Sequence, residues 1–362
     1  MGELSAVSCE LSAGWVGGGP AMIRDVLEKL LARESLPAAA TEECFTALMA
    51  GDWSEPEQAA FLVALRAKGE TAVEVAAAAR VLRSFAVAVP TSRVRLIDTC
   101  GTGGDGAHTI NISTGAALVT AACGVGVAKH GNRSVSSRCG SADVLEALGV
   151  RLDLEPEQLG ALLDSEGFAF LFAPRLHPAM RVVMPVRRAL GVRTAFNLLG
   201  PLANPAGVRR QVVGVYNREV MPLVAGALAE LGAERAWVVH SEDGLDELSV
   251  CAPTRVIEVR DGLVTGDLTI DPERLGIGRG SHADLAGGDA EENARRLRAI
   301  LEGRERSPAA EAVALNAAAA LLVAGAEPNL PAALASSRAC LAAGRGATKL
   351  DSVICKIREL AG

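Results

Sequence analysis

Residues 94–130 read VRLIDTCGTGGDGAHTINISTGAALVTAACGVGVAKH and contain a strand–loop–helix–strand pattern. The apolar run Val94–Asp98 predicts a short buried strand, and a glycine-rich loop follows it. Ser113–Cys123 then predicts a helix, and Val125–Ala128 predicts a second buried strand. Strands that alternate with helices pair in parallel and carry the helices on the faces of the sheet, so this stretch predicts an α/β domain.

The same alternation continues along the chain. Further apolar runs that predict buried strands occur at Phe168–Phe172, Gln211–Tyr216 and Arg235–His240. Helical patterns between them occur at Ala142–Leu148 and Glu219–Leu231. Residues 255–264 predict a β-hairpin around Asp261-Gly262, and the chain from Ala290 onward predicts alanine-rich helix. We therefore expect residues 93–362 to form the larger domain, with a mostly parallel central sheet flanked by helices.

The first ninety residues have a helical pattern instead. Apolar residues at helical spacing predict helices at Met22–Leu31, Thr41–Ala50, Glu55–Ala67 and Thr71–Phe85. Thr71 and Glu74 have the spacing of a capping box, in which each side chain satisfies an amide of the first helical turn. We expect a small helical domain at 21–92, with part of 174–205 packing on it. Residues 1–20 are expected to be a flexible extension.

Length and charge limit the classes of protein. The chain has 362 residues, more than one hydrophobic core usually serves, so two domains are expected. Its 36 Lys and Arg against 43 Asp and Glu give a formal net charge of −7. An acidic protein lacks the positive field that attracts nucleic acid or an anionic membrane surface, so neither is expected as a partner. This balance still permits a local basic pocket.

Several absences in the sequence indicate the compartment. The longest apolar stretches, Gly115–Ala128 and Ala317–Ala326, are too short to span a membrane. The first residues lack a basic segment followed by an apolar run, so no signal peptide is expected. None of the eight cysteines forms a C-x-x-C pair, so neither a disulfide scaffold nor a zinc ribbon is expected. The sequence therefore predicts a cytoplasmic protein.

The loop after the first strand is rich in glycine. Gly101, Gly103 and Gly106 formally satisfy G-x-G-x-x-G. A dinucleotide-binding fold would begin its helix at this loop and carry an acidic residue about twenty positions further on. Here the helix begins only near Ser113 and the next strand ends in Lys129, so that interpretation fits poorly. The loop can still present backbone amides to an anion, and a plain tight turn is the alternative.

Two further polar segments would lie at the same edge of the sheet. Asn111–Thr114 begins the next helix with small polar residues, which suits either an anion site or ordinary helix capping. The loop Lys129–Ser141 combines cations, serines and glycines, and a solvated basic loop is its alternative. Because the glycine-rich loop and the loop Lys129–Ser141 follow neighbouring parallel strands, they meet at the carboxyl edge where α/β ligands bind. Together they predict a ligand with two phosphate groups.

A third loop at this edge is acidic. Ser241–Ser249 reads SEDGLDELS and holds four carboxylates in six residues. Such charges would repel a phosphorylated ligand unless a cation lay between them. Mg²⁺ is often shared between one or two carboxylates and substrate phosphates, so we expect Mg²⁺ here; an acidic surface turn is the alternative.

Taken together, the segments resemble the anthranilate phosphoribosyltransferase family over residues 22–360. The matching stretches are GTGGD at 101–105, NIST at 111–114, KHGNR at 129–133, Val186-Arg187, FNLLGP at 196–201 and DGLDELS at 243–249. The resemblance implies an N-terminal helical domain joined to a larger α/β domain, with the active site at the hinge. It also implies homodimers formed through helices, and it leaves open an association with an anthranilate synthase.

The resemblance implies a reaction between anthranilate and phosphoribosyl pyrophosphate that gives N-(5-phosphoribosyl)anthranilate and pyrophosphate, a step of tryptophan synthesis. The residues it assigns to substrate binding are Gly101, Gly104, Asp105, Thr109, Asn111, Ile112, Ser113, Thr114, Lys129, His130, Gly131, Asn132, Arg133, Ser136, Ser137, Ser141 and Arg187. Of these, it makes Lys129 and Asp105 the catalytic candidates. Ser113, Asp246 and Glu247 would coordinate Mg²⁺, as two ions when the donor is bound.

Two of these assignments have structural alternatives. Arg187 would face the anthranilate carboxylate, for which a planar guanidinium is suited, or would form a surface ion pair. His130 would line the same pocket or be a hydrogen-bonded buried ring. Two other functions are alternatives: a related pyrimidine nucleoside phosphorylase, and a non-enzymatic relative that binds nucleic acid. The second would be expected to lose the acid pair Asp246-Glu247 and gain positive charge, and this chain does neither.

Overall fold

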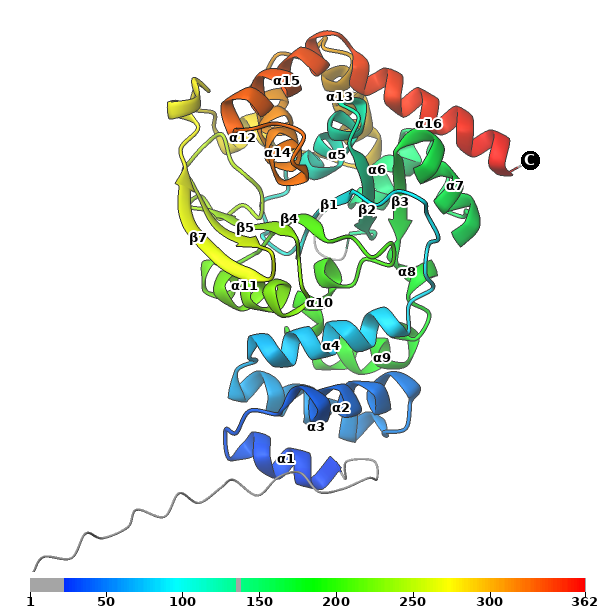
Figure 1. Ribbon diagram of the computed structural model, residues 1–362, viewed down its shortest axis with the longest axis vertical. Helices are drawn as coiled ribbons and strands as arrows, with labels where there is room; N and C mark the ends of the chain where they lie inside the picture. Colours follow the sequence, from blue (N-terminus) through cyan, green and yellow to red (C-terminus); the bar gives the residue numbers. More distant parts are fainter. Residues whose placement is uncertain (1–22, 135–137, 362) are drawn as a thin grey trace, which may run out of the picture.

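The computed structural model describes residues 23–134 and 138–361 (Figure 1). Its first helices are α1 (Ile23–Leu31), α2 (Ala38–Ala50), α3 (Glu55–Lys68) and α4 (Ala72–Ser84). The helices predicted for this region are therefore confirmed, and they form one end of an elongated molecule, opposite the α/β part. The extension expected at 1–20 lies outside the described residues.

The capping box predicted for α4 is present. The Glu74 carboxylate accepts a hydrogen bond from the Thr71 amide at 2.8 Å, and the Glu74 amide donates to the Thr71 hydroxyl at 3.3 Å. The same carboxylate accepts from the Leu36 amide and pairs with Lys68, both at 2.8 Å. A single buried acid thus begins α4 and also fixes the loop between α1 and α2.

Two later helices complete the helical part, α9 (Met180–Leu190) and α10 (Phe196–Leu202). α9 packs against α2 and α3, and α10 packs against α4. The Phe45 ring lies 5.5 Å from the Phe61 ring and 5.8 Å from the ring of Phe196, between centroids. Three of the few aromatic residues therefore form one cluster, which joins α2, α3 and α10 although they lie far apart in sequence.

A seven-stranded sheet forms the centre of the α/β part, in the order β3-β2-β1-β4-β5-β6-β7. Its strands are β1 (Leu96–Gly101), β2 (Gly126–Gly131), β3 (Phe168–Phe172), β4 (Arg210–Gly214), β5 (Arg235–Ser241), β6 (Thr254–Arg260) and β7 (Leu263–Ile270). The first five strands pair in parallel, and β6 and β7 are antiparallel at one edge. The predicted α/β class with a mostly parallel sheet is confirmed.

Helices cover both faces of this sheet (Figure 1). They are α5 (Ile112–Ala122), α6 (Ser141–Ala147), α7 (Pro156–Glu166), α8 (Ala173–Leu176), α11 (Met221–Glu230), α12 (His282–Leu285), α13 (Ala290–Leu301), α14 (Pro308–Ala324), α15 (Leu330–Ala342) and α16 (Arg345–Ala361). Short 3₁₀ turns lie at Arg218–Val220 and Glu273–Leu275. α5 and α14 pack closely on one face, whereas α11 packs on β5 and β6 and also against α4.

The structure differs from the sequence pattern at several elements. β1 begins at Leu96 rather than Val94, whose side chain is 95% exposed, and it runs on to Gly101. Its polar second half is strand because Thr99 and Gly101 pair with β4. α7 was not expected from the pattern. The predicted hairpin is confirmed, with positive φ angles at Asp261 and Gly262 in its turn, although β7 extends beyond the expected range.

The chain passes between the helical and α/β parts more than once. It leaves α4 at Ser84 and reaches β1 at Leu96, returns to α9 and α10 after β3, and then continues to β4. Backbone hydrogen bonds from Val87 to Leu176 and from Val89 to Pro205 tie the first of these connections to the returning segment. Within the described ranges, no helix is both long and apolar enough to cross a bilayer.

Candidate active site

The three polar loops lie at one edge of the sheet, as the sequence predicted. β1, β2, β4 and β5 are parallel neighbours, so their carboxyl ends point the same way. The glycine-rich loop follows β1, the basic loop follows β2 and the acidic loop follows β5. Parallel topology therefore brings phosphate-suited backbone and acidic side chains together at the position where α/β proteins bind ligands.

Glycines allow the acidic loop to lie directly on the glycine-rich loop. The Asp246 Oδ2 atom accepts a hydrogen bond from the Gly103 amide at 3.0 Å. A Cβ atom on Gly101 would lie 2.5 Å from the same Oδ2, and one on Gly214 would lie 1.5 Å from the Asp246 carbonyl oxygen. Any side chain at Gly214 would therefore displace the acidic loop, which explains glycine at the end of β4.

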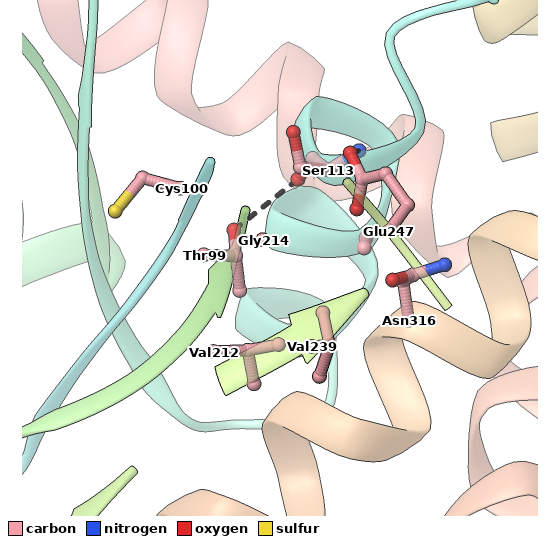
Figure 2. A pocket seen from close by; sticks show the side chains of 9 residues that line it. Thr99, Cys100, Ser113, Val212, Gly214, Val239, Glu247 and Asn316 are labelled. Carbon is pink, nitrogen blue, oxygen red and sulfur yellow. Dashed lines mark hydrogen bonds between the residues drawn. The ribbon is translucent and has the colours of Figure 1, made fainter. Parts of the chain in front are cut away.

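The neighbouring acid reaches the start of α5. Glu247 accepts a hydrogen bond from the Ser113 amide at 3.1 Å, and the Thr99 hydroxyl donates to the Ser113 carbonyl at 3.2 Å. Figure 2 shows the Glu247 and Ser113 side chains side by side at a small pocket, which Asn316 also lines. The positive end of a helix dipole thus faces the carboxylate.

The surroundings of Asp246 and Glu247 disfavour the ionised forms of both side chains. Burial raises the pKa of Asp246 well above its usual range, and the charges of Asp105 and Glu247 raise it further. Burial likewise raises the pKa of Glu247 to about 7, although Lys129 and Ser113 act in the opposite direction. The charge of Asp105 therefore acts on both acids, a charge arrangement that a divalent cation would relieve.

The donor set fits Mg²⁺ rather than a metal held by protein alone. Among residues 23–134 and 138–361, no three His, Cys, Asp or Glu side chains are grouped so as to hold an ion by themselves. Mg²⁺ usually takes one or two carboxylates and completes its shell with water and substrate phosphates. Asp246 and Glu247, which lie against the glycine-rich loop and the first turn of α5, fit that requirement.

Lys129 lies on β2, beside β1, and is only 2% exposed. Its ammonium group donates to the Thr99 carbonyl oxygen. Burial raises the pKa of Asp98, while Lys129 and the amides of Asn204 and His130 lower it. Because Lys129 also lowers the pKa of Glu247, its charge stabilises the ionised forms of both Asp98 and Glu247.

His130 is a hydrogen-bonded buried ring in this structure. Its Nδ1 lies 3.1 Å from the Gly200 carbonyl oxygen, and its Nε2 lies 3.2 Å from Nε2 of His177. Burial lowers the pKa of His130 to about 3 and that of His177 to about 4, so both rings are neutral. His130 then donates through Nδ1 and accepts from His177, which leaves His177 Nδ1 as a buried acceptor without a partner among the described residues.

Arg187 does not form the surface ion pair that the sequence allowed. Its guanidinium lies 5.2 Å from the centroid of the Phe196 ring, and Nη1 lies 3.8 Å from the Met184 sulfur. Burial lowers its pKa, and no carboxylate of the described chain pairs with it. A half-buried cation without an acidic partner is suited to bind an anionic group from outside the chain.

The other residues assigned in the basic loop hold the loop itself. The Asn132 carbonyl accepts from the hydroxyl of Ser141 at 3.2 Å. Arg133 pairs with Asp143 and Glu146 at 2.9 and 2.5 Å, so it is not an unpaired cation for a phosphate. Gly131 ends β2. The assigned Ser136 and Ser137 lie outside the described residues.

The residues assigned in the glycine-rich loop and at the start of α5 have different surroundings. The side chains of Ile112 and Thr114 are buried, and the Thr114 hydroxyl has no hydrogen-bond partner in the described chain. Asp105 accepts from the Ala107 amide at 3.2 Å and stays near the acid pair. Thr109 forms an isolated bridge with Ala286.

Two side chains far along the chain hydrogen-bond to the glycine-rich loop and to the start of α5, and no sequence motif indicated them. Asn293 on α13 donates to the Asn111 side-chain oxygen at 3.0 Å. Arg193 donates to the Gly104 carbonyl at 2.8 Å and stacks on Tyr216, with 3.6 Å to the ring centroid. Neither had a distinguishing signal in the sequence, because Asn293 lies among the charged residues of α13 and Arg193 in a short segment between helices.

Comparison with known proteins agrees with this geometry. Residues 93–347 match the glycosyl transferase family, a/b domain, and residues 24–86 match its helical bundle domain. Anthranilate phosphoribosyltransferases of Desulfatibacillum aliphaticivorans and Anaeromyxobacter dehalogenans are 48% and 52% identical over 92% of this chain and 98% of their own. The chain belongs to the anthranilate phosphoribosyltransferase family.

Solved structures of the family have the same fold. The enzyme of Thermus thermophilus is 47% identical, with a TM-score of 0.88 over 92% of this chain and 99% of that one. The enzyme of Saccharomyces cerevisiae, in complex with PRPP and Mg, is 26% identical, with a TM-score of 0.86 over 94% of this chain and 99% of its own. Another structure of the yeast family member is in complex with 4-fluoroanthranilate.

Proposed function

We propose that the protein transfers the phosphoribosyl group of phosphoribosyl pyrophosphate to the amine of anthranilate, giving N-(5-phosphoribosyl)anthranilate and pyrophosphate in tryptophan synthesis. The observation that carries the proposal is the meeting of the glycine-rich loop with the half-buried acid pair Asp246-Glu247 at one sheet edge. Such a site suits a ligand that brings both phosphates and a divalent cation. Family membership supports the same activity.

The chemistry requires stabilisation of the leaving group. As the bond from the anomeric carbon to pyrophosphate breaks, negative charge grows on the pyrophosphate oxygens, and fixed donors at that position lower the barrier. The amides of the glycine-rich loop and the positive end of α5 would supply such donors. Lys129 would contribute its charge from the end of β2, and Asp105 would lie beside the metal-bound pyrophosphate. When bound, Mg²⁺ would neutralise phosphate charge and link it to Ser113, Asp246 and Glu247.

The amine acceptor would bind near α9 and α10. The unpaired guanidinium of Arg187 would hold the anthranilate carboxylate, stacked as it is on Phe196. Gly101 and Asn132 would contact the same substrate. The aromatic amine loses its proton only as the new bond forms, so no strong base is required of the chain. The lowered pKa values of His130 and His177 make both rings weak bases, which agrees with this mechanism.

A direct assay tests this proposal. Anthranilate is fluorescent, and its consumption is followed as loss of that fluorescence, with and without phosphoribosyl pyrophosphate and Mg²⁺. We expect loss only when both are present. Turnover of a pyrimidine nucleoside with phosphate, in place of anthranilate consumption, would favour the phosphorylase, and tight binding of nucleic acid with no turnover would favour the non-enzymatic relative.

Several finer features are part of the same proposal. We expect dependence on Mg²⁺, with two ions bound beside the donor, to be measurable by titration with Mn²⁺. A homodimer formed through the helices is supported by Leu31 and Val63, apolar side chains of the helical part that are 71% and 44% exposed. Sedimentation equilibrium measures it. Cytoplasmic location and an association with an anthranilate synthase rest on the family resemblance, and co-purification tests the latter.

A further inference from the structure

The backbone of the acidic loop is held by one side chain from a distant helix. Asn316 lies in the middle of α14 and is 3% exposed. Its Nδ2 donates to the Leu248 carbonyl oxygen at 2.8 Å, and its Oδ1 accepts from the Leu248 amide at 3.0 Å. The side-chain amide thus pairs with both polar groups of one residue, as a neighbouring strand would.

The orientation of this side chain is fixed. The second N–H of Nδ2 donates to the Ala312 carbonyl one turn earlier, at 2.9 Å. Exchanging nitrogen and oxygen would set the oxygen against two carbonyls and the amino group against the Leu248 N–H. Both N–H groups and the oxygen of Asn316 are therefore used, and the amide has one hydrogen-bonded orientation.

Asparagine at this position is not explained by α14 itself. The helix is otherwise built largely of buried alanine, leucine and valine, and a buried amide is costly unless it is hydrogen-bonded. Asparagine also disfavours helix interiors because it competes for backbone hydrogen bonds. Its partner outside the helix, Leu248, accounts for its presence.

The pairing of Asn316 with the Leu248 backbone, called the clamp below, lies next to the acid pair in sequence. Leu248 follows Glu247 directly, and the buried side chains of Leu245 and Leu248 flank the two acids in sequence. On the other side, Asp246 is held by the Gly103 amide and Glu247 by the Ser113 amide. Figure 2 shows Asn316 on α14 near Glu247, at the edge of the same pocket.

We propose that Asn316 is a positioning residue that keeps Asp246 and Glu247 together for a divalent cation and its pyrophosphate. The inference rests on the proposed function for the identity of that ligand. Like charges so close together tend to separate, and loop backbone that is clamped at Leu248 cannot yield to that repulsion. Without Asn316, the buried amide and carbonyl of Leu248 lose their partners, and the loop relaxes away from the glycine-rich loop.

Mn²⁺ binding to the full chain tests this directly, with and without pyrophosphate, by the electron paramagnetic resonance signal of free Mn²⁺. Asn316→Leu keeps the branched shape of the side chain and removes the clamp, and the smaller Asn316→Ser is the second variant should the first not fold. We expect Mn²⁺ affinity to fall about tenfold or more, as for other partners that orient metal ligands. Hydrogen exchange at residues 245–250 should become faster. In turnover, the Mg²⁺ requirement should rise while the KM for anthranilate stays within about twofold.

Two controls separate positioning from stability. Ser337→Ala removes a buried hydrogen bond that stays within α15, to Ala333 at 2.9 Å, and Leu321→Ala leaves a cavity in α14. Both should lower thermal stability without changing Mn²⁺ affinity. Equal Mn²⁺ affinity in the Asn316 variants and these controls would overturn the inference, as would a wild-type chain that binds no Mn²⁺ even with pyrophosphate. A chain that binds Mn²⁺ but consumes no anthranilate would refute only the proposed function.

Discussion

Glu247→Gln should change how the stability of the protein depends on pH. Burial raises the pKa of Glu247 from 4.5 to about 7 in the folded chain. Between these values the folded state keeps a proton that the unfolded state has lost, so unfolding releases a proton and rising pH favours it. A difference of about 2.5 pKa units, at about 1.36 kcal/mol each, corresponds to roughly 3 kcal/mol.

Glutamine at this position is neutral at every pH. We therefore expect the unfolding free energy of Glu247→Gln, minus that of wild type, to grow by about 3 kcal/mol from pH 4 to pH 8, the larger part below pH 7. The charge of Glu247 also raises the pKa of Asp246, so its removal adds to this difference in unfolding free energy. Urea unfolding in metal-free buffer across this range provides the free energies, with equal m-values as a check on two-state behaviour.

The exposed acid of the same loop offers a matched control. Glu242→Gln removes one carboxylate four residues before Asp246 and should leave the profile parallel to that of wild type. Parallel profiles for Glu247→Gln as well would refute the reasoning, because they would mean that Glu247 ionises as freely in the folded chain as in the unfolded one. The experiment requires no substrate and is independent of the proposed activity.

Three further predictions concern the site. Asp246→Asn with Glu247→Gln should greatly reduce Mg²⁺-dependent turnover, and unchanged rates at limiting Mg²⁺ would disprove the metal assignment. Arg187→Ala should raise the KM for anthranilate more than that for the donor in steady-state kinetics; equal effects on both would indicate a structural role. Gly214→Ala places a Cβ 1.5 Å from the Asp246 carbonyl oxygen, so Mn²⁺ affinity should fall, and an unaltered titration would mean that the loop accommodates it.

Sequence patterns predicted those parts of the fold that depend on neighbours along the chain. The glycine-rich loop after β1 and the acid pair after β5 follow from strand–helix alternation, because parallel strands end at one edge. Helix α7 was missed although Pro156 and Gly167 bound it, since no strand pattern separated it from α6.

The partners of the site could not be predicted in the same way. Asn204 donates to Asp98 from 106 residues away, and Asn316 clamps Leu248 from 68 residues away. Each is a lone polar residue in an apolar stretch, and such residues have many structural uses. Only the folded chain shows which backbone or carboxylate meets them. His130 is a similar case, because its pKa is lowered first by burial in the folded chain and then by His177, 47 residues further on.

The way the chain passes back into the helical part affects how it can be divided. In sequence the helical bundle is a contiguous segment, since its match at 24–86 ends before the match at 93–347 begins. In space its core includes Val183 and Phe196. A fragment that starts near residue 93 would therefore expose the apolar faces of α9 and α10 and would be prone to aggregate. Chimeras between relatives need matched junctions before β1, after β3 and before β4, so the two parts must be exchanged as interleaved segments.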